Sequence, residues 1–283
     1  MGTDPHDVKA ILARRRDNGG DFWASSDGRI YVGHPFSTLG ALGMLHELRV
    51  GADHPAVKGG LALILKACQP DGRIRVAPKA PLYPCYSAEA ARVMCRYRPA
   101  ARAALDRAMA RLLEEVHASG GWRCNFTKFG RGPETTCANP GATLYALDVF
   151  RFFPRYRRGV APVDHAVGTL LDHWEVRRPI GPCHYGIGST FLQVEYPFLR
   201  YNLFYYVYVL SFFDRAKRDR RFQAALAALE SRLTAKGEVV VERPHRGLKG
   251  LEFCAKGRPS APATARYREI RRNLATSIRQ IQG

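Results

Sequence analysis

Cysteine and histidine are the residue types in this sequence best suited to chemistry. Cys85, Cys124 and Cys137 lie in irregular stretches between helices or where a helix begins, and Cys183-His184 occupies a later stretch of the same kind. Thiolates and imidazoles are the ligands that zinc prefers, at about 2.0–2.3 Å in tetrahedral geometry. The sequence therefore predicts a zinc site built from Cys85, Cys124, Cys137 and His184, with Cys183 as a further candidate. The alternative is that each cysteine is a small buried hydrophobic residue, as free cysteines usually are.

The loop between Cys124 and Cys137 carries candidate catalytic and anion-binding groups. Glu134 and, in the next irregular stretch, His184 are candidate general acids or bases. The alternative for Glu134 is a negative charge near a helix N-terminus, where the helix dipole stabilises it. Lys128 and Arg131 are expected to meet a phosphate or diphosphate at the same place.

A second candidate binding region lies in the most apolar stretch, residues 196–213. Tyr201 and Tyr205 recur at helical spacing, and their ring faces would stabilise a carbocation or hold an isoprenoid tail if they line a cavity. Packing in the core is the alternative. Arg200 lies at the start of the most buried helix expected in this stretch, and a charge that enters a core needs a partner, either Glu195 or a bound anion.

Repeated helical hairpins are the elements that must position these groups. Glycine turns at Gly28, Gly72, Gly121, Gly181 and Gly237 lie 44, 49, 60 and 56 residues apart, a period typical of helical repeats. Each turn is expected to end an outer helix, because glycine adopts the left-handed conformation at low cost. The second helices of the hairpins are expected at residues 35–48, 87–97, 140–152, 197–213 and 262–281.

The most apolar of these helices indicates how the hairpins are arranged. Residues 203–210 are apolar or aromatic on every face, so this helix must be surrounded by protein. That pattern favours an all-α fold, a double-walled α/α toroid of about five helical hairpins in a single domain from residue 1 to 283. An open solenoid is the competing architecture.

The charge balance is the second strong signal. Lys and Arg number 44 against 25 Asp and Glu, a net charge of +19, with local groups at residues 14–16, 155–158, 215–221 and 271–272. Such an excess attracts nucleic acid, anionic lipid or a phosphorylated substrate. A solvated basic exterior is the plain alternative. The polar N-terminus and the charged or polar residues within 196–213 predict no signal peptide and no transmembrane segment, and hence a cytoplasmic protein.

Two turns carry a resemblance to a known superfamily. The segments 69–74 (Gln-Pro-Asp-Gly-Arg-Ile) and 119–122 (Ser-Gly-Gly-Trp) resemble turns of the terpenoid cyclase and protein prenyltransferase α/α toroids. The segments 121–124, 185–188 and 196–198, with Cys137 ahead of a helix, resemble bacterial prenyltransferase/squalene-oxidase-repeat proteins. The segment around Cys85 is similar to the Asp-x-Cys-Tyr-Ser zinc motif of prenyltransferase β subunits, with Tyr83 in the place of Asp. The Asp-x-Asp-Asp motif of protonating cyclases is absent from the sequence.

Two functions are consistent with these features. The first is a prenyltransferase-like or terpene-cyclase-like enzyme that holds an isoprenoid-type substrate in a central cavity and uses zinc. The alternative is a non-catalytic basic helical-repeat module that binds nucleic acid or an acidic partner, with structural zinc.

Overall fold

All regular elements in the described part of the chain are helical, which confirms the all-α prediction. The computed structural model describes residues 5–97, 102–124, 137–180 and 185–279. Within these ranges the extended pieces form isolated bridges and no strand. None of the described helices combines the length and hydropathy needed to cross a bilayer.

The chain divides into two compact units, each described here by itself. Unit 1 comprises Met1–Glu115 with His245–Phe253, and unit 2 comprises Val116–Pro244 with Cys254–Gly283. The closed toroid and the single domain stay predictions.

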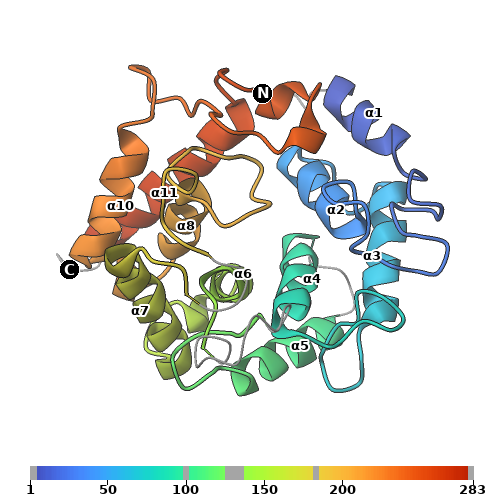
Figure 1. Cartoon of the computed structure of the whole chain (residues 1–283), viewed down its shortest axis with the longest axis horizontal. Helices are drawn as coiled ribbons and strands as arrows, with labels where there is room; N and C mark the ends of the chain where they lie inside the picture. Colours follow the sequence, from blue (N-terminus) through green and yellow to red (C-terminus); the bar gives the residue numbers. More distant parts are fainter. Residues whose placement is uncertain (1–4, 98–101, 125–136, 181–184, 280–283) are drawn as a thin grey trace. The chain divides into compact units, whose positions relative to one another are not determined.

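Unit 1 is a set of helical hairpins built around α2. Helix α2 packs against α1, α3 and α4, and α4 packs in turn against α3 and α5 (Figure 1). The buried carboxylate of Asp7 in α1 accepts hydrogen bonds from the backbone of Glu252 (2.9 Å) and Phe253 (2.7 Å), which ties the late segment to this unit. The helices are α1 (Pro5–Ala13), α2 (Thr38–Glu47), α3 (Pro55–Ala67), α4 (Pro84–Tyr97), α5 (Arg102–Glu114) and the short η3 (Arg246–Leu248).

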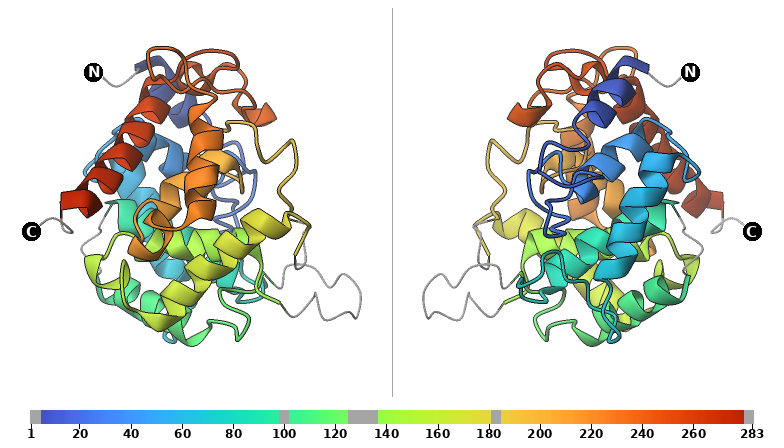
Figure 2. Two further views of the ribbon diagram at one scale, coloured as in Figure 1. Left: turned by 90° about the vertical axis from the view of Figure 1, so that its left-hand side faces the viewer. Right: turned by 90° about the vertical axis from the view of Figure 1, so that its right-hand side faces the viewer.

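Unit 2 is organised around α8. This helix packs against α6, α10 and α11, and all of its residues are buried, as expected for a helix that is apolar on every face. Figure 2 shows α7 and α10 side by side in this unit. The helices are α6 (Pro140–Phe150), η2 (Pro154–Tyr156), α7 (Ala161–Val176), α8 (Leu203–Leu210), α9 (Asp214–Lys217), α10 (Arg220–Glu230) and α11 (Ala261–Arg279).

The glycine turns are copies of one backbone structure. At each, the glycine N–H donates to the carbonyl three residues earlier, at 2.8–3.0 Å, and φ lies between +71° and +87°. The glycines of this set are Gly28, Gly72, Gly120 and Gly237. The left-handed conformation expected from the sequence is therefore confirmed, with Gly120 rather than Gly121 in the equivalent place. Gly181 lies outside the described residues.

Three of these turns, at Gly72, Gly120 and Gly237, are hydrogen-bonded to the helix that follows them, whereas after Gly28 the corresponding amide of Ile30 donates to the Val76 carbonyl at 2.9 Å. In the three, the residue two positions after the turn glycine donates its N–H to a Ser or Thr hydroxyl in that helix: Ile74 to Ser87 at 3.0 Å, Trp122 to Thr143 at 3.1 Å and Val239 to Thr264 at 3.0 Å. Because these N–H groups are buried, each hydroxyl satisfies a donor that would otherwise be costly.

The second helices begin at side-chain caps. Ser37, Asn139, Asn202 and Ser260 each accept a hydrogen bond from the amide three residues later. These caps satisfy one of the unpaired donors at a helix N-terminus. The cap at Asn202 explains one wrong boundary: α8 begins at Leu203, so Arg200 and Tyr201 precede this helix rather than lie within it.

Candidate functional site: a basic pocket in unit 2

The predicted zinc ligands fall partly outside the described residues. Cys85 is buried near the start of α4 in unit 1, while Cys124 is buried and Cys137 half-buried in unit 2. Among described side chains, no three His, Cys, Asp or Glu are grouped so as to hold a metal ion. The remaining candidates, Lys128, Arg131, Glu134, Cys183 and His184, lie outside the described residues. The zinc site therefore stays a prediction.

Arg200 has a protein partner, and it is Glu195. Its guanidinium donates to both carboxylate oxygens of Glu195, from Nε at 2.6 Å and from a terminal nitrogen at 2.8 Å. Burial raises the pKa of Glu195 above its ordinary value, while the Arg200 guanidinium opposes that rise. Of the two partners that the sequence leaves open for Arg200, the structure shows the carboxylate.

Tyr201 and Tyr205 are both anchored in the core of unit 2. The Tyr201 hydroxyl lies 2.9 Å from Nδ1 of the buried His173, and the Nε2 of this histidine lies 3.1 Å from the Arg178 carbonyl. Tyr205 is fully buried and donates from its hydroxyl to Oδ2 of Asp148 at 2.8 Å. Among described residues these contacts fit the packing alternative; a role in substrate binding stays a prediction.

The ring of Tyr205 belongs to a column of aromatic side chains. Phe198 stacks on Tyr205 at 5.0 Å between ring centroids and on Tyr208 at 4.9 Å, and Tyr208 meets Phe212 edge-on at 5.4 Å. The Arg151 guanidinium lies 4.8 Å from the ring centroids of both Tyr208 and Phe212. The column thus ends at a cation and at Phe212.

Arg151 is a buried charge that is fully compensated. It forms an ion pair with Asp148, one turn earlier on α6. Burial by itself would lower the pKa of Arg151, but Asp148 and the nearby Tyr208 outweigh that effect and raise it. The same Asp148 carboxylate receives the Tyr205 hydroxyl, so both of its oxygens are engaged. This pair is a structural element and offers no charge to a ligand.

A pocket of about 170 Å³ lies at the outer end of the aromatic column. It is lined by Pro154, Arg157, Arg158, Phe212, Asp214, Lys217 and Asn273. Three segments far apart in the sequence meet here: η2 with the residues after it, α9, and α11. The Asp214 amide donates to the Arg157 carbonyl at 3.1 Å, which joins α9 to the segment after η2. Helix α11 packs against α9, and its Asn273 donates to the hydroxyl of Ser211, the C-cap residue of α8, at 3.0 Å.

The cations of this pocket differ in how they are held. Nε of Arg157 donates to the Arg151 carbonyl at 2.8 Å, and its guanidinium lies 5.4 Å from the Phe212 ring centroid. Burial, and then the charge of Arg151, lower the pKa of Arg157. Lys217 is paired with Asp214 at 3.0 Å. Arg158 is exposed and forms neither an ion pair nor a hydrogen bond with described residues.

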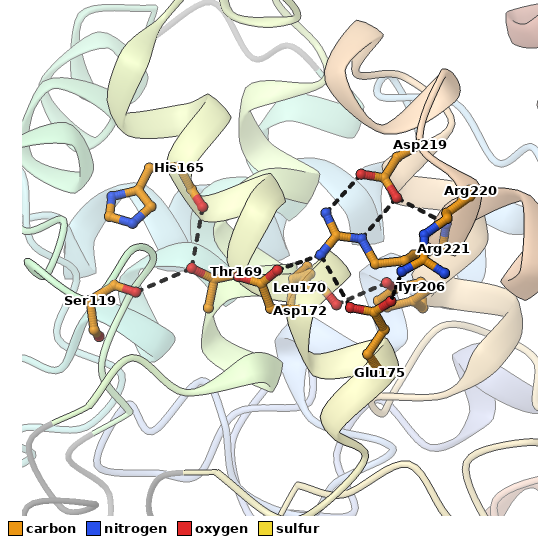
Figure 3. A network of polar contacts seen from close by, with 10 residues as sticks. All are labelled: Ser119, His165, Thr169, Leu170, Asp172, Glu175, Tyr206, Asp219, Arg220 and Arg221. Atoms are coloured by element: carbon orange, nitrogen blue, oxygen red, sulfur yellow. Dashed lines mark hydrogen bonds and ion pairs between the residues drawn. The ribbon is translucent and has the colours of Figure 1, made fainter.

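On the face of unit 2 formed by α7 and the start of α10, carboxylates neutralise the basic side chains. Arg221 at the start of α10 pairs with Asp219 and with Asp172 of α7, and Arg220 pairs with Glu175 of α7 at 2.6 Å. Figure 3 shows these carboxylates surrounding the Arg221 guanidinium. The hydrogen bond to Arg221 holds the pKa of the Asp219 carboxyl below its ordinary value. In the basic segment 215–221, the last two arginines therefore join two helices.

In the first part of that segment Lys217 alone has such a partner among described residues, Asp214. Arg215 and Arg218 are exposed and form no ion pair with described residues, and the same holds for Arg155 in η2 and for Arg158 beyond it. The sequence marks these groups as basic but not as neighbours. Their convergence depends on α9 packing against both α7 and α11, which no local pattern reveals.

Comparisons of the sequence with models of protein families and with curated proteins found no match.

Proposed function

We propose that this protein is a basic helical-repeat module that binds nucleic acid through the phosphate backbone, with unit 2 as the binding unit. The observation that carries the proposal is the convergence of two basic segments, one after α6 and one around α9, on a pocket that Asn273 of α11 completes. Nucleic-acid affinity comes largely from Lys and Arg side chains that neutralise phosphates and release counterions.

The distribution of charge supports this choice of unit. Unit 2 contains 25 Lys and Arg against 12 Asp and Glu, whereas unit 1 contains 19 against 13. The excess in unit 2 therefore accounts for 13 of the 19 net charges. Arg155, Arg215 and Arg218 are exposed cations of this unit that form no ion pair with a described carboxylate, so they are available to phosphates.

The second candidate is the enzyme that the resemblance implies, acting on a diphosphate-bearing isoprenoid with zinc. One observation favours it: an anion-sized basic pocket stands directly against Phe212, at the end of a column of aromatic rings. The rings themselves are packed against one another in the described residues. The nucleic-acid proposal needs no cavity among them, and for that reason it comes first.

Fluorescence anisotropy with a labelled single strand and a labelled duplex tests the proposal. The dissociation constant is measured between 50 and 200 mM NaCl for the wild type and for the triple variant Arg155→Gln/Arg215→Gln/Arg218→Gln. Removal of one phosphate-binding cation lowers the slope of log K against log[salt] by about 0.7–0.9, so the slope of the triple variant is expected to be smaller by about 2–3.

The matched control removes three exposed cations of unit 1, as Arg49→Gln/Lys58→Gln/Lys66→Gln. Each triple variant loses three positive charges, so the net charge changes equally in both. The three side chains of the control form no ion pair with described residues. Their removal is expected to leave the slope nearly unchanged. Equal slopes for both triple variants, or no binding to either nucleic acid at 50 mM NaCl, would contradict the proposal. Turnover of a prenyl diphosphate by the zinc-loaded protein would favour the second candidate.

A further inference from the structure

We propose that the pocket between η2, α9 and α11 is a specific site for a phosphomonoester dianion. The inference deepens the proposed function, on which it rests for the source of the phosphate: a phosphorylated strand end. Its chemistry rests on the pocket alone, whose donors, charge and size each select this group.

Arg157 provides the central donor. Its Nε is already bonded to the Arg151 carbonyl, so the orientation of the guanidinium is fixed before any ligand arrives. The Phe212 ring beneath it restrains the plane further. Both terminal nitrogens have no hydrogen-bond partner among described residues, and this fork matches two oxygens of one phosphate. A preorganised guanidinium loses little entropy on binding.

The charge of the pocket matches a dianion. Asp214 is its only acidic lining residue among those described, and Lys217 neutralises it at 3.0 Å. Arg157 and Arg158 then remain as two positive charges that form no ion pair with a described carboxylate, since the charges of Glu269 and Asp214 act on Arg157 only from farther away. A phosphomonoester carries about −1.5 to −2 at neutral pH, whereas a phosphodiester within a strand carries a single charge.

Asn273 and the pocket volume add selectivity. Nδ2 of Asn273 donates one of its hydrogens to the Ser211 hydroxyl, which leaves the second hydrogen for a ligand oxygen. Pro154 and Phe212 supply apolar walls, and a volume of about 170 Å³ accommodates one phosphate with its nearest ester group. A diester has only two free oxygens, because its other two are bonded to the chain on both sides, so it cannot offer three oxygens to these donors. The geometry therefore favours a terminal phosphate.

The test compares oligonucleotides that differ only at the strand end. Anisotropy gives affinities for a 5′-phosphorylated strand, a 3′-phosphorylated strand and the unphosphorylated strand, and calorimetry gives the affinity for inorganic phosphate against chloride. The expected result is tighter binding of one phosphorylated strand and measurable binding of inorganic phosphate. Arg157→Gln is expected to reduce phosphate affinity roughly 10- to 100-fold, the range for a charge-assisted hydrogen-bond pair.

Arg158→Gln is a second test in case Arg157→Gln does not fold. Arg158 is exposed and makes no hydrogen bond or ion pair with described residues, so its replacement removes no such contact from the folded protein. It is expected to weaken phosphate binding several-fold. Lys236→Gln, an equal charge change at an exposed residue of the turn after α10, is expected to have no effect. Circular dichroism melts of all three variants report folding independently.

The outcomes separate the two proposals. Equal affinity for phosphorylated and unphosphorylated strands, with no binding of inorganic phosphate, overturns the pocket and leaves the nucleic-acid function standing. Binding of inorganic phosphate or of a prenyl monophosphate that Arg157→Gln abolishes, without any binding of nucleic acid, supports the pocket and overturns the proposed function. Equal phosphate affinity in Arg157→Gln, Arg158→Gln and Lys236→Gln overturns the pocket.

Discussion

In unit 2 a buried charge is balanced by one oppositely charged side chain. Removal of that side chain leaves the charge of its partner buried and unbalanced. Asp148 compensates Arg151 and receives the Tyr205 hydroxyl. Breaking a buried ion pair from one side costs about 3–5 kcal/mol, because the remaining charge stays in a low-dielectric interior. We expect Asp148→Asn to lower the free energy of unfolding by that amount in urea titrations. Glu114→Gln, which breaks an exposed pair with Arg111, should cost no more than about 1 kcal/mol, and equal losses would contradict the argument.

His173 makes unit 2 sensitive to acid. Burial lowers its pKa below the ordinary value of about 6.5, so the unfolded chain binds a proton more readily than the folded one. Stability is therefore fully present above about pH 6.5 and is lost as the pH falls toward the lowered pKa. We expect the free energy of unfolding to fall between pH 7 and pH 5, and His173→Gln to flatten that fall. Glu195, whose raised pKa acts in the opposite direction, is common to both proteins and cancels in the difference.

The helical hairpins were largely predictable from sequence because their signals are local. A turn glycine needs a left-handed backbone and a cap needs a short polar side chain, and both requirements can be read within a few residues. Residues 140–152 and 262–281 thus matched α6 and α11 closely. The segment 197–213 did not, because apolar composition does not distinguish the irregular chain before Asn202 from the helix after it. Helix α1 was not anticipated for a related reason: it is short, and it is fixed by the long-range bonds of Asp7.

The glycine turns offer a matched test of that local reasoning. Gly72 and Gly237 both have positive φ, of +87° and +71°. A Cβ at Gly72 would clash with the backbone oxygen of Arg107, whereas a Cβ at Gly237 would meet nothing within 4 Å. We expect Gly237→Ala to cost about 1 kcal/mol, the strain of the left-handed conformation. Gly72→Ala should cost clearly more in the same denaturant titration, and equal losses would mean that the turn shifts freely away from α5.

The candidate site was less predictable than the hairpins because it depends on long-range packing. The basic groups at residues 155–158, 215–221 and 271–272 were visible in the sequence, but nothing local distinguished Arg220 and Arg221, which pair with α7, from the cations before them. For the same reason, the sequence did not single out Arg157 as a candidate site residue. Its role follows from the Arg151 carbonyl that orients it and from α9 and α11, which complete the pocket around it.

At the scale of the whole molecule, a net charge of +19 opposes the compact state through self-repulsion. Salt screens that repulsion, with a Debye length of about 10 Å at 0.1 M, so we expect the thermal midpoint to rise between 20 and 200 mM NaCl. Inorganic phosphate at equal ionic strength should raise it further, because a ligand bound only by the folded state at 100 times its Kd adds about 2.7 kcal/mol. General exclusion of phosphate from the surface would persist in Arg157→Gln, whereas stabilisation through the pocket would disappear. A phosphate increment of the same size in both proteins would show that the charge of the molecule, and not the pocket, responds to the anion.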